Sequence, residues 1–313
     1  MNLSARKIGG KVRSLIWDRI EKERDLRACD NVCTETLRTV CLTLGPYRNL
    51  TTLTASVLYL HPRCQVLNHA GGRVFGDPRI DFLANYSEET FERFVRYALR
   101  ASQTGRRGKH GGSIRHSHAV EDRPQMREAI GAMAPKDQPI CLVWKESLRT
   151  SNHIRRNGVD LGEMLTRNPA LRFLMPVRNP LDCAVSNMRK GHVRLFDGLD
   201  GEADILATLK AIVDEFAWFR QLQHQHPDRF FHYFEHDPPQ QVMTRLAEFL
   251  QLDACEEWLQ AGHQAFQVSS NYRHSPKATD HFRELVLAKL GNDEEFSRPL
   301  LSFVDVEQPV APG

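Results

Sequence analysis

Short apolar runs alternate with longer amphipathic stretches along this chain. The runs have the length of buried strands and cover residues 39–44, 63–70, 138–144, 171–177 and 229–234. Between them apolar residues recur at helical spacing, and the predicted helices cover residues 53–60, 79–101, 158–168, 203–225, 239–251, 255–264 and 280–290. A charged helical lead-in, residues 1–36, comes first. The alternation predicts a three-layer α/β/α fold around a central, mostly parallel sheet. With no internal repeat or clear boundary, we expect one domain over residues 1–313.

The run at 171–177 ends in a sharp turn with a chemically informative pair of residues. Arg178 stands at the end of the predicted strand, and Ser186 lies about one turn into the next helix. Asp182 is expected to cap that helix, and Pro180 sits where a helix start tolerates it. A guanidinium and a hydroxyl that converge suit an oxyanion. The equally weighted alternative is a structural corner in which Arg178 pairs with Asp182.

A loop at residues 45–52 connects the first predicted strand to a helix that opens on two threonines. This is the layout of a phosphate-binding loop, in which N–H groups at the helix start point at an anion. The nucleotide-triphosphatase motif G-x-x-x-x-G-K-[ST] is not matched, because Leu50 replaces the second Gly and the nearest cation is Arg48. The loop therefore argues against Mg-ATP and fits a 5′-phosphate group. A merely capped helix start is the alternative.

Two further strand ends carry polar residues. His69 follows the second predicted strand beside a Gly pair, and Lys145 ends the third. Since parallel strands end at one edge of the sheet, these side chains are expected to meet there. His69 is a candidate general base, with a structural hydrogen-bonding role as the alternative. Lys145 can stabilise negative charge on a leaving group.

Residues 104–118 form a Gly-rich, cationic insertion with three histidines. We interpret it as a lid or acceptor-binding loop for an anionic or polyhydroxyl substrate, against the alternative of a solvated loop. His116 and His118 would point the same way on an extended chain. No acidic partner at suitable spacing supports a metal site there.

Composition narrows the partners. The 313 residues carry a net charge of +3, which is too small to indicate nucleic acid but is compatible with a locally held anion. No run approaches the roughly 20 apolar residues of a membrane span, and the N-terminus lacks an apolar core of signal-peptide type. The seven cysteines are odd in number and scattered, without the spacing of a zinc site. We expect a cytoplasmic protein with reduced thiols and no metal.

These segments together resemble the sulfotransferases that use 3′-phosphoadenosine 5′-phosphosulfate (PAPS). The family's first loop reads like P-K-S-G-T-T, and the matching stretch here is 46–52. Its second signature, R-N-P-x-D-x-x-x-S, matches Arg178, Asn179, Pro180, Asp182 and Ser186 position for position. Residues 145–147 look like its strand-end Lys segment, and 233–250 like its late strand–helix unit. The resemblance covers about residues 38–290 and implies a P-loop-NTPase-like fold.

The resemblance implies PAPS as cofactor and an in-line transfer of its sulfuryl group to a hydroxyl or amine. The implied catalytic residues are His69, Arg48 and Lys145. The implied cofactor-binding residues are Pro46, Tyr47, Arg48, Asn49, Leu50, Thr51, Thr52, Arg178, Ser186, Arg273 and Lys277. Among these, Arg178 and Ser186 would hold the 3′-phosphate, and Arg273 or Lys277 would close over it.

The sequence departs from the family pattern at three positions. Arg48 stands for the loop Lys, which keeps the charge but not the shape, and Leu50 stands for the loop Gly. Ser147 occupies the position of the base in cytosolic members. In glycan-type members the base is a Glu after the second strand, a position that corresponds to His69, so we expect His69 to be the base.

Two other functions stay open. One is a non-catalytic relative that binds PAP (the desulfonated product), another anion or a glycan, as Leu50 and Ser147 suggest. The other, less favoured, is a P-loop kinase, which the missing loop Lys opposes. The acceptor is an unidentified small molecule or a glycan, and the oligomeric state, including a homodimer, is open. No nucleic acid and no membrane span are expected.

Overall fold

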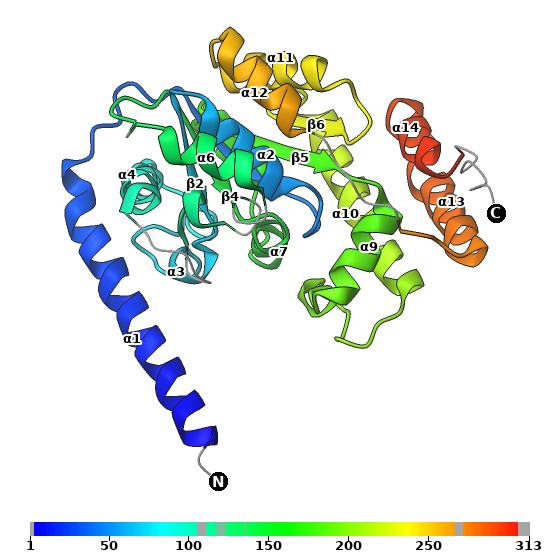
Figure 1. Ribbon diagram of the computed structural model, residues 1–313, viewed down its shortest axis with the longest axis horizontal. Helices are drawn as coiled ribbons and strands as arrows, with labels where there is room; N and C mark the ends of the chain where they lie inside the picture. The colour runs from blue at the N-terminus through cyan, green and yellow to red at the C-terminus, as the bar shows by residue number, and fades with distance from the viewer. Residues whose placement is uncertain are drawn as a thin grey trace.

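A six-stranded sheet forms the centre of the structure, which is a computed structural model (Figure 1). The structure describes residues 3–104, 111–117, 120, 123–134, 136–266 and 272–305. The strand order is β3-β2-β4-β1-β5-β6. The strands are β1 (Thr39–Thr43), β2 (Cys64–Asn68), β3 (Gly112–Ser113), β4 (Cys141–Lys145), β5 (Leu171–Val177) and β6 (Phe230–Phe234). The five strands predicted from the apolar runs are all present.

The strand pairing is parallel except at one edge. β2, β4, β1, β5 and β6 pair in parallel along the sheet, whereas β3 pairs antiparallel with β2. The chain places β2 and β4 on one side of β1 and then crosses to β5 on the other side. The order therefore reverses around β1, and ligands of open α/β sheets bind at such a reversal, outside the carboxyl ends of the strands.

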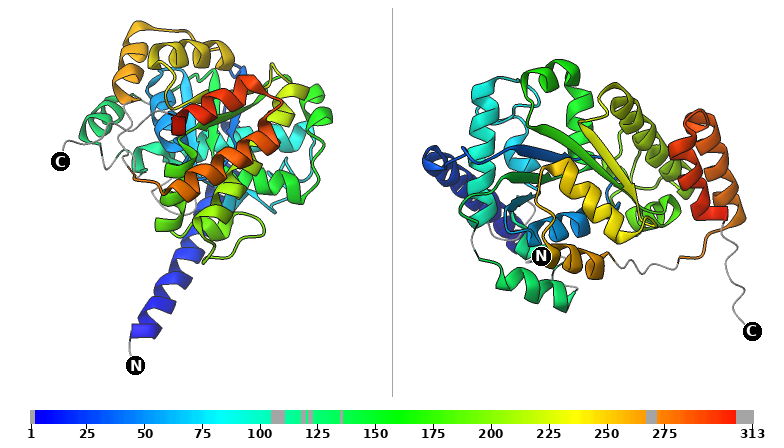
Figure 2. Two further views of the ribbon diagram at one scale, coloured as in Figure 1. Left: turned by 90° about the vertical axis from the view of Figure 1, so that its right-hand side faces the viewer. Right: turned by 90° about the horizontal axis from the view of Figure 1, so that it is seen from above.

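Helices cover both faces of the sheet, which confirms the predicted layers (Figure 2). The described helices are α1 (Leu3–Ala28), α2 (Thr51–Leu60), α3 (Gly71–Val74), α4 (Glu88–Thr104), α6 (Pro124–Ala132), α7 (Leu148–Arg156), α8 (Leu161–Arg167), α9 (Pro180–Arg189), α10 (Ile205–Gln225), α11 (Pro239–Leu250), α12 (Glu256–Ala265), α13 (Pro276–Leu290) and α14 (Glu294–Asp305). Short 3₁₀ turns, η1 (Cys29–Asn31), η2 (Ile114–His116) and η3 (Val193–Leu195), join some of them.

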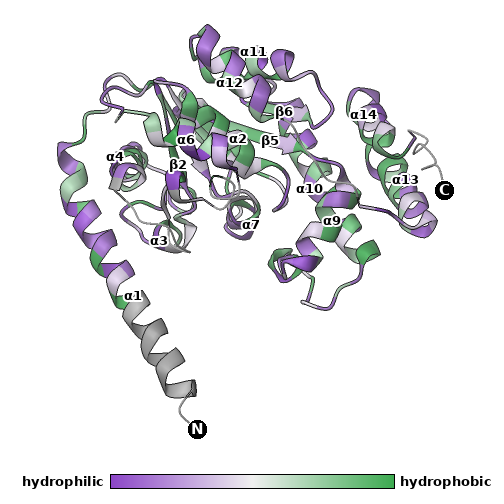
Figure 3. Ribbon diagram, in the orientation of Figure 1, coloured by the Kyte–Doolittle hydropathy of each residue, from purple (hydrophilic) through white to green (hydrophobic). Residues whose placement is uncertain are grey.

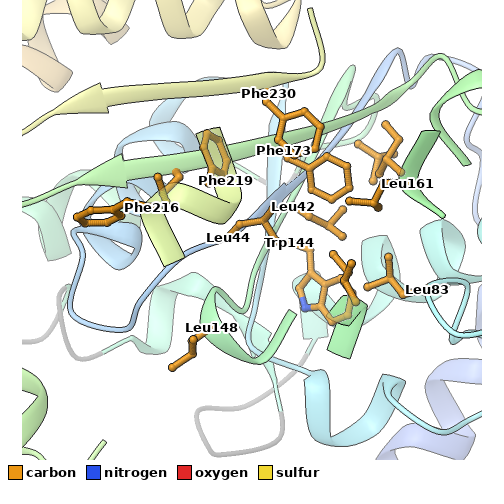
Figure 4. Packing of buried hydrophobic residues seen from close by; sticks show 14 of the residues in the cluster. Leu42, Leu44, Leu83, Trp144, Leu148, Leu161, Phe173, Phe216, Phe219 and Phe230 are labelled. Carbon is orange, nitrogen blue, oxygen red and sulfur yellow. The ribbon is translucent and has the colours of Figure 1, made fainter. Parts of the chain in front are cut away.

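Each face of the sheet has its own apolar core. Val40 and Leu42 of β1 point into the cluster that packs against α4, α7, α9 and α10, and aromatic rings fill much of it (Figure 4). Cys41, between them, points into the cluster under α2, α6, α11 and α12. Because strands buried on both faces have no solvent side, they read as continuous apolar runs, which is why the sequence predicts them well.

Several helix boundaries differ from the predicted ones. α4 begins at Glu88 and not at residue 79, because the preceding segment is held by local polar bonds. Asp81 accepts hydrogen bonds from the backbone N–H groups of Gly76 and Ala84, and Arg79 bonds Asp77. The helices α3, α6, α7 and α14 and the strand β3 were not predicted. α7 is mostly polar and α3 starts on two glycines, so neither carries an apolar helical pattern.

α1 (Leu3–Ala28) lies within the predicted helical lead-in at residues 1–36 and projects from the body of the protein as a rod (Figure 1). Figure 3 shows hydrophilic and hydrophobic residues mixed along the coloured part of α1, whereas α2 is predominantly hydrophobic. Within the described residues no helix has the length and apolar character to cross a membrane.

Candidate functional site

Three strand ends are joined by backbone hydrogen bonds at the edge where β1, β2 and β4 terminate. The Ser147 N–H donates to the Thr43 carbonyl (3.1 Å), and the His69 N–H donates to the Lys145 carbonyl (2.8 Å). The residues that the sequence places after these strands are therefore neighbours, as expected for parallel strands.

The same edge collects most of the unusual backbone of the described chain. Of the six non-glycine residues with positive φ, five lie here: Arg48, Leu50, His69, Ala70 and Ser147. Each such residue costs roughly 1–2 kcal/mol relative to right-handed backbone. Strain of this kind persists where the surrounding structure enforces it, and it concentrates at functional sites.

The loop after β1 is fastened to β5 by a single buried side chain. The Asn49 carboxamide donates to the Pro176 carbonyl, and its oxygen accepts from the Arg178 N–H at 2.8 Å. Gly45, at φ 87°, donates its N–H to Ser151 Oγ (3.1 Å), and a Cβ there would meet the Met175 side chain at 2.7 Å. The loop thus has one defined path across the ends of β1 and β5.

Leu50 ends this loop in left-handed backbone, with φ 59° and ψ 0°, at the N-cap of α2. Leu50 thus has a backbone conformation that glycine favours. Leu50 has no polar side-chain atom, and α2 has no side-chain capping bond. The first N–H groups of α2, at Thr51 and Thr52, are therefore open to an anion, and the predicted alternative of a capped helix start is not what forms.

The corner after β5 has conventional capping, but by a different residue from the one predicted. Asn179 caps α9 by accepting from the N–H groups of Leu181 (3.0 Å) and Asp182 (3.4 Å), and Pro180 opens the helix. The expectation that Asp182 caps α9 was wrong, because the helix begins at Pro180, two residues before Asp182. Asp182 instead lies 3.6 Å from Arg178 and 2.8 Å from the His274 ring.

Arg48 links Arg178 to Ser186. Arg48 Nε donates to Ser186 Oγ at 2.9 Å, and Arg178 donates to the Arg48 carbonyl at 3.4 Å. Arg178 is only 8% exposed, and its Nε has no hydrogen-bond partner. The predicted alternative, a pairing of Arg178 with Asp182, forms, and one buried N–H donor of Arg178 is left over. Binding of an oxyanion by Arg178 stays a prediction.

Lys145 and His69 also meet. Lys145 Nζ lies 3.3 Å from His69 Nε2. Lys145 is 3% exposed, and burial, together with the charge of Arg48, lowers its pKa to about 8. A buried ammonium close to a second cation is a site where an anion gains most, because little water competes for the charge.

Three consecutive residues at the end of β4 hold the turn that carries His69. Trp144 donates its indole N–H to the His69 carbonyl, the Lys145 carbonyl accepts from the His69 N–H, and Glu146 accepts from the Gly71 N–H at 2.8 Å. Glu146 is fully buried, and burial raises its pKa. No role was predicted for Trp144 or Glu146, since nothing local in the sequence signals what they touch.

Tyr47 is fixed in the loop by α9. Its carbonyl accepts from the Asn187 side chain at 2.7 Å, and its ring lies 5.4 Å from that of His192. Burial, and then the Glu146 carboxylate, raise the pKa of Tyr47. Burial, followed by the charges of Arg48 and Lys145, lowers the pKa of His192. A neutral imidazole and a neutral phenol thus border the cations, and the sequence did not single out His192 or Asn187.

The C-terminal tail reaches the site through a residue that was not predicted. Arg273 and Lys277 are exposed, and in the part of the chain that the structure describes neither makes a hydrogen bond or ion pair. Their neighbour His274 bonds Asp182, and the Arg189 guanidinium of α9 lies over the Tyr272 ring at 4.8 Å. The tail therefore approaches α9, while the predicted closure by Arg273 or Lys277 stays a prediction.

The predicted insertion at 104–118 is only partly described. Residues 105–110 and His118 lie outside the described residues, so its role as a lid stays a prediction. Within the described ranges, no group of three or more His, Cys, Asp or Glu side chains is arranged to hold a metal. The seven cysteines are all free.

Cavities do not by themselves locate this site. Two, of about 320 and 300 Å³, are lined by residues 154–162 and 165–166 together with the end of α10 and the segment before β6. Their linings contain none of the strand-end residues described above. We place the candidate site by the convergence of charged and unpaired groups instead.

No protein-family model and no curated protein matches this sequence. Among solved structures, the fold is similar to a mouse sulfotransferase complexed with PAP, at 12% identity and TM-score 0.42, covering 90% of this chain and 93% of that one. It is also similar to the sulfotransferase domain from the curacin biosynthetic pathway (17% identity, TM-score 0.40, covering 88% and 93%) and to a sulfotransferase from Mycobacterium avium (13%, 0.42, 83% and 76%). These neighbours are of the kind of protein that the motifs resemble. Similarity this distant does not establish cofactor, acceptor or base.

Proposed function

We propose that this protein is a sulfotransferase that moves a sulfuryl group from PAPS to a hydroxyl or amine. One observation carries the proposal: the uncapped start of α2 and the cluster of Arg48, Arg178 and Ser186 lie at the same sheet edge as the Lys145–His69 pair. Two separate anion-binding places next to a buried Lys and a His suit a ligand with two phosphate groups and a reacting end.

The chain's own unpaired donors fit such a ligand. The N–H groups of Thr51 and Thr52 would receive the 5′-phosphosulfate, with Arg48 beside them. Arg178, with its buried and unpartnered Nε, and Ser186 would receive the 3′-phosphate. Pro46, Tyr47, Asn49 and Leu50 would shape the loop around it, and Arg273 or Lys277 would approach from the tail.

PAPS, when bound, supplies the sulfuryl group and leaves as PAP. Lys145, as an ammonium held in a dry site, offsets the negative charge that develops on the leaving phosphate oxygen. Because Arg48 and Lys145 already provide fixed positive charge at this place, we propose that the reaction needs no metal.

His69 is the proposed general base. Its Nε2 lies 3.3 Å from Lys145 Nζ, so a charged Lys145 donates to that nitrogen and the ring proton then sits on Nδ1. When Lys145 turns to an anion instead, Nε2 would take the proton from the acceptor hydroxyl. The hydrogen bond from Trp144 to the His69 carbonyl, and the one that Glu146 accepts from the Gly71 N–H, keep the backbone of the turn that carries His69 in place during this change.

A non-catalytic binding protein is the second candidate. Two observations favour it: Lys145 occupies Nε2 of the only base we assign, and Leu50 and Ser147 replace the family's residues. Such a protein would bind PAP, another anion or a glycan through the same donors without turnover. A P-loop kinase is less favoured, because the loop lacks its Lys.

The remaining assignments are also proposals. We place the protein in the cytoplasm because its seven cysteines are free thiols. We further propose a single domain over residues 1–313, with residues 1–36 as a helical lead-in and 104–118 as an insertion for the acceptor, a small molecule or a glycan. A homodimer is compatible with this proposal.

The experiment is a transfer assay with sulfur-labelled PAPS against a panel of phenols, alcohols, amines and glycans. We expect label in at least one acceptor class, and a loss of kcat of about 100-fold or more in His69→Ala with PAP affinity retained. If His69→Ala turns over normally, His69 is not the base. Tight PAP binding without transfer to any acceptor would favour the non-catalytic candidate.

A further inference from the structure

Exposed apolar side chains gather on α1. Within the described residues, five large hydrophobic side chains are exposed, and three of them lie within five positions of this helix. Ile16 is 53% exposed, Trp17 65% and Ile20 52%. Ile16 and Ile20 are four residues apart and share a face, and Trp17 lies beside them. Such a cluster on an otherwise polar surface marks an interaction site.

The position of these side chains is set by the other side of the helix. Arg73, which is buried, pairs with Asp18 (2.5 Å) and Glu21 (2.9 Å). Arg79 pairs with Glu23 at 2.7 Å, and Lys22 pairs with Asp77 at 2.6 Å. The bonds of Asp18, Glu21 and Lys22 fasten one face of α1 to the body, whereas Glu23 lies two helical turns after Ile16 and near its face. The helix extends beyond the body as a rod (Figures 1 and 2).

These ion pairs neutralise the acidic residues of α1, so the charge that α1 presents to solvent is mainly positive. All three acidic residues from 18 to 23 are used in ion pairs with Arg73 and Arg79. Arg19 is exposed, and so is Arg24, whose guanidinium lies 3.5 Å from the Asp25 carboxylate. Residues 1–17 add Arg6, Lys7, Lys11 and Arg13 to the sequence and contain no Asp or Glu. The apolar cluster is therefore set in a basic segment.

We propose that α1 docks on the surface of an anionic phospholipid membrane, with Ile16, Trp17 and Ile20 inserted at the headgroup boundary. Isoleucine and tryptophan side chains suit that boundary, and anionic headgroups attract the surrounding Lys and Arg residues. A second copy of the chain is the weaker occupant, because pairing two such helices would bring like charges together. The helix lies on the surface and does not cross the bilayer.

Vesicle cosedimentation of the full chain tests this. We expect binding to phosphatidylcholine vesicles that contain about 30% phosphatidylserine, at lipid concentrations of about 1 mM, and little binding to phosphatidylcholine alone. Raising the salt concentration should weaken binding, because it screens the lipid charge. The variant Ile16→Ser/Ile20→Ser should lose about tenfold in vesicle affinity.

A matched control distinguishes binding through α1 from binding through any exposed hydrophobic side chain. Leu287 on α13 is 60% exposed, and Leu287→Ser should bind vesicles like the wild type. All three altered side chains are exposed, so an unchanged Tm would show that the fold is intact. Trp17 offers a direct signal. Trp144 and Trp258 are buried, and Trp218 is half-buried under the Arg155 guanidinium. A blue shift of emission on adding anionic vesicles should therefore vanish in Trp17→Phe.

Several results would overturn the proposal. Absence of binding to the anionic vesicles, or equal loss in Leu287→Ser and in the α1 variant, would do so. A concentration-dependent dimer that the α1 variant abolishes, without vesicle binding, would identify a second copy as the occupant. None of these readouts depends on catalytic activity, so they stand apart from the proposed sulfotransferase function.

Discussion

Two strand-to-helix connections lie next to each other in this protein and are built in opposite ways. The corner between β5 and α9 is relaxed: Asn179 caps the helix and Pro180 opens it. The loop between β1 and α2 is strained: Arg48 and Leu50 have positive φ, and no side chain caps α2.

The difference indicates that the corner and the loop have different roles. The corner is satisfied by its own residues, so it can hold Arg178 and Ser186 in place before any ligand arrives. The loop leaves helix N–H groups open and depends on Asn49, which ties it to β5. Strain that is enforced from outside and donors left without partners are what a site for an anion requires.

Removing the Asn49 side chain should show the difference between the loop and the corner most clearly. Asn49→Ala leaves the Arg178 N–H and the Pro176 carbonyl buried and unpaired, so we expect a loss of about 3 kcal/mol in the free energy of unfolding. Asn179→Ala removes only a helix cap and should cost about 1 kcal/mol. Urea unfolding of both variants measures the difference. Equal costs would mean that the loop does not depend on Asn49.

Truncating Arg178 tests the corner. Arg178→Ala should weaken PAP binding by about 50-fold, the value of a charge-assisted hydrogen-bond pair. Arg172→Ala, at the other end of the same strand, is the control, because Arg172 bonds the Asp228 carbonyl far from the site. Calorimetric titration gives both affinities. Unchanged affinity in Arg178→Ala would remove the 3′-phosphate site from the corner.

The pH dependence of PAP affinity tests the role of Lys145, the cation at the end of β4 next to the loop. Burial lowers the pKa of Lys145 to about 8, so its ammonium form is present below pH 8 and is lost above it. We expect a constant affinity from pH 6.5 to about 8, then a fall of up to about tenfold per pH unit, because binding must then take up a proton.

The lowered pKa of Lys145 makes stability rise with pH, whereas it makes PAP affinity fall. The folded state releases the Lys145 proton at a lower pH than the unfolded state does, so this residue makes the protein more stable as pH rises from about 8 towards 10.5. Lys145→Met should remove both effects, whereas Lys190→Met, at an exposed lysine, should remove neither. An affinity that falls above pH 8 equally in Lys145→Met would assign the titration elsewhere.

The smallest effect is expected from relieving the loop's strain. Leu50→Gly should keep PAP affinity within about twofold, because Leu50 already has the backbone that glycine favours. Its stability should change by less than about 1 kcal/mol, since relief of strain is offset by chain entropy and lost packing. Gln251→Gly, also at positive φ but remote from the loop, is the control. A tenfold gain in affinity would show that Leu50 obstructs the site.

The sequence predicted the sheet and the sheet edge well, for a physical reason. Strands buried on both faces are continuous apolar runs, and their order along the chain implies which ends meet. The contact of Lys145 with His69, and the nearness of Arg178 and Ser186 to Arg48, followed from that. Both pairs combine residues that lie at the ends of predicted elements.

What the sequence did not predict depends on contacts between distant segments. The roles of Asn49, Trp144 and Glu146 arise from bonds to Pro176, His69 and Gly71, and no local pattern encodes them. The capping of α9 by Asn179 was missed because Asp182 is an equally good cap by residue type. α7 was missed because its residues are mostly polar and it depends on its neighbours for burial.

The most direct test of the account compares PAP with ADP by calorimetric titration of the wild-type protein. Both ligands carry an adenosine and two phosphate groups, but only PAP has one at the 3′ position. If the loop and the corner form a two-phosphate site, PAP should bind at least about 50-fold more tightly than ADP, and Arg178→Ala should remove most of that preference. Equal affinities, or a preference for ADP that requires Mg²⁺, would contradict it.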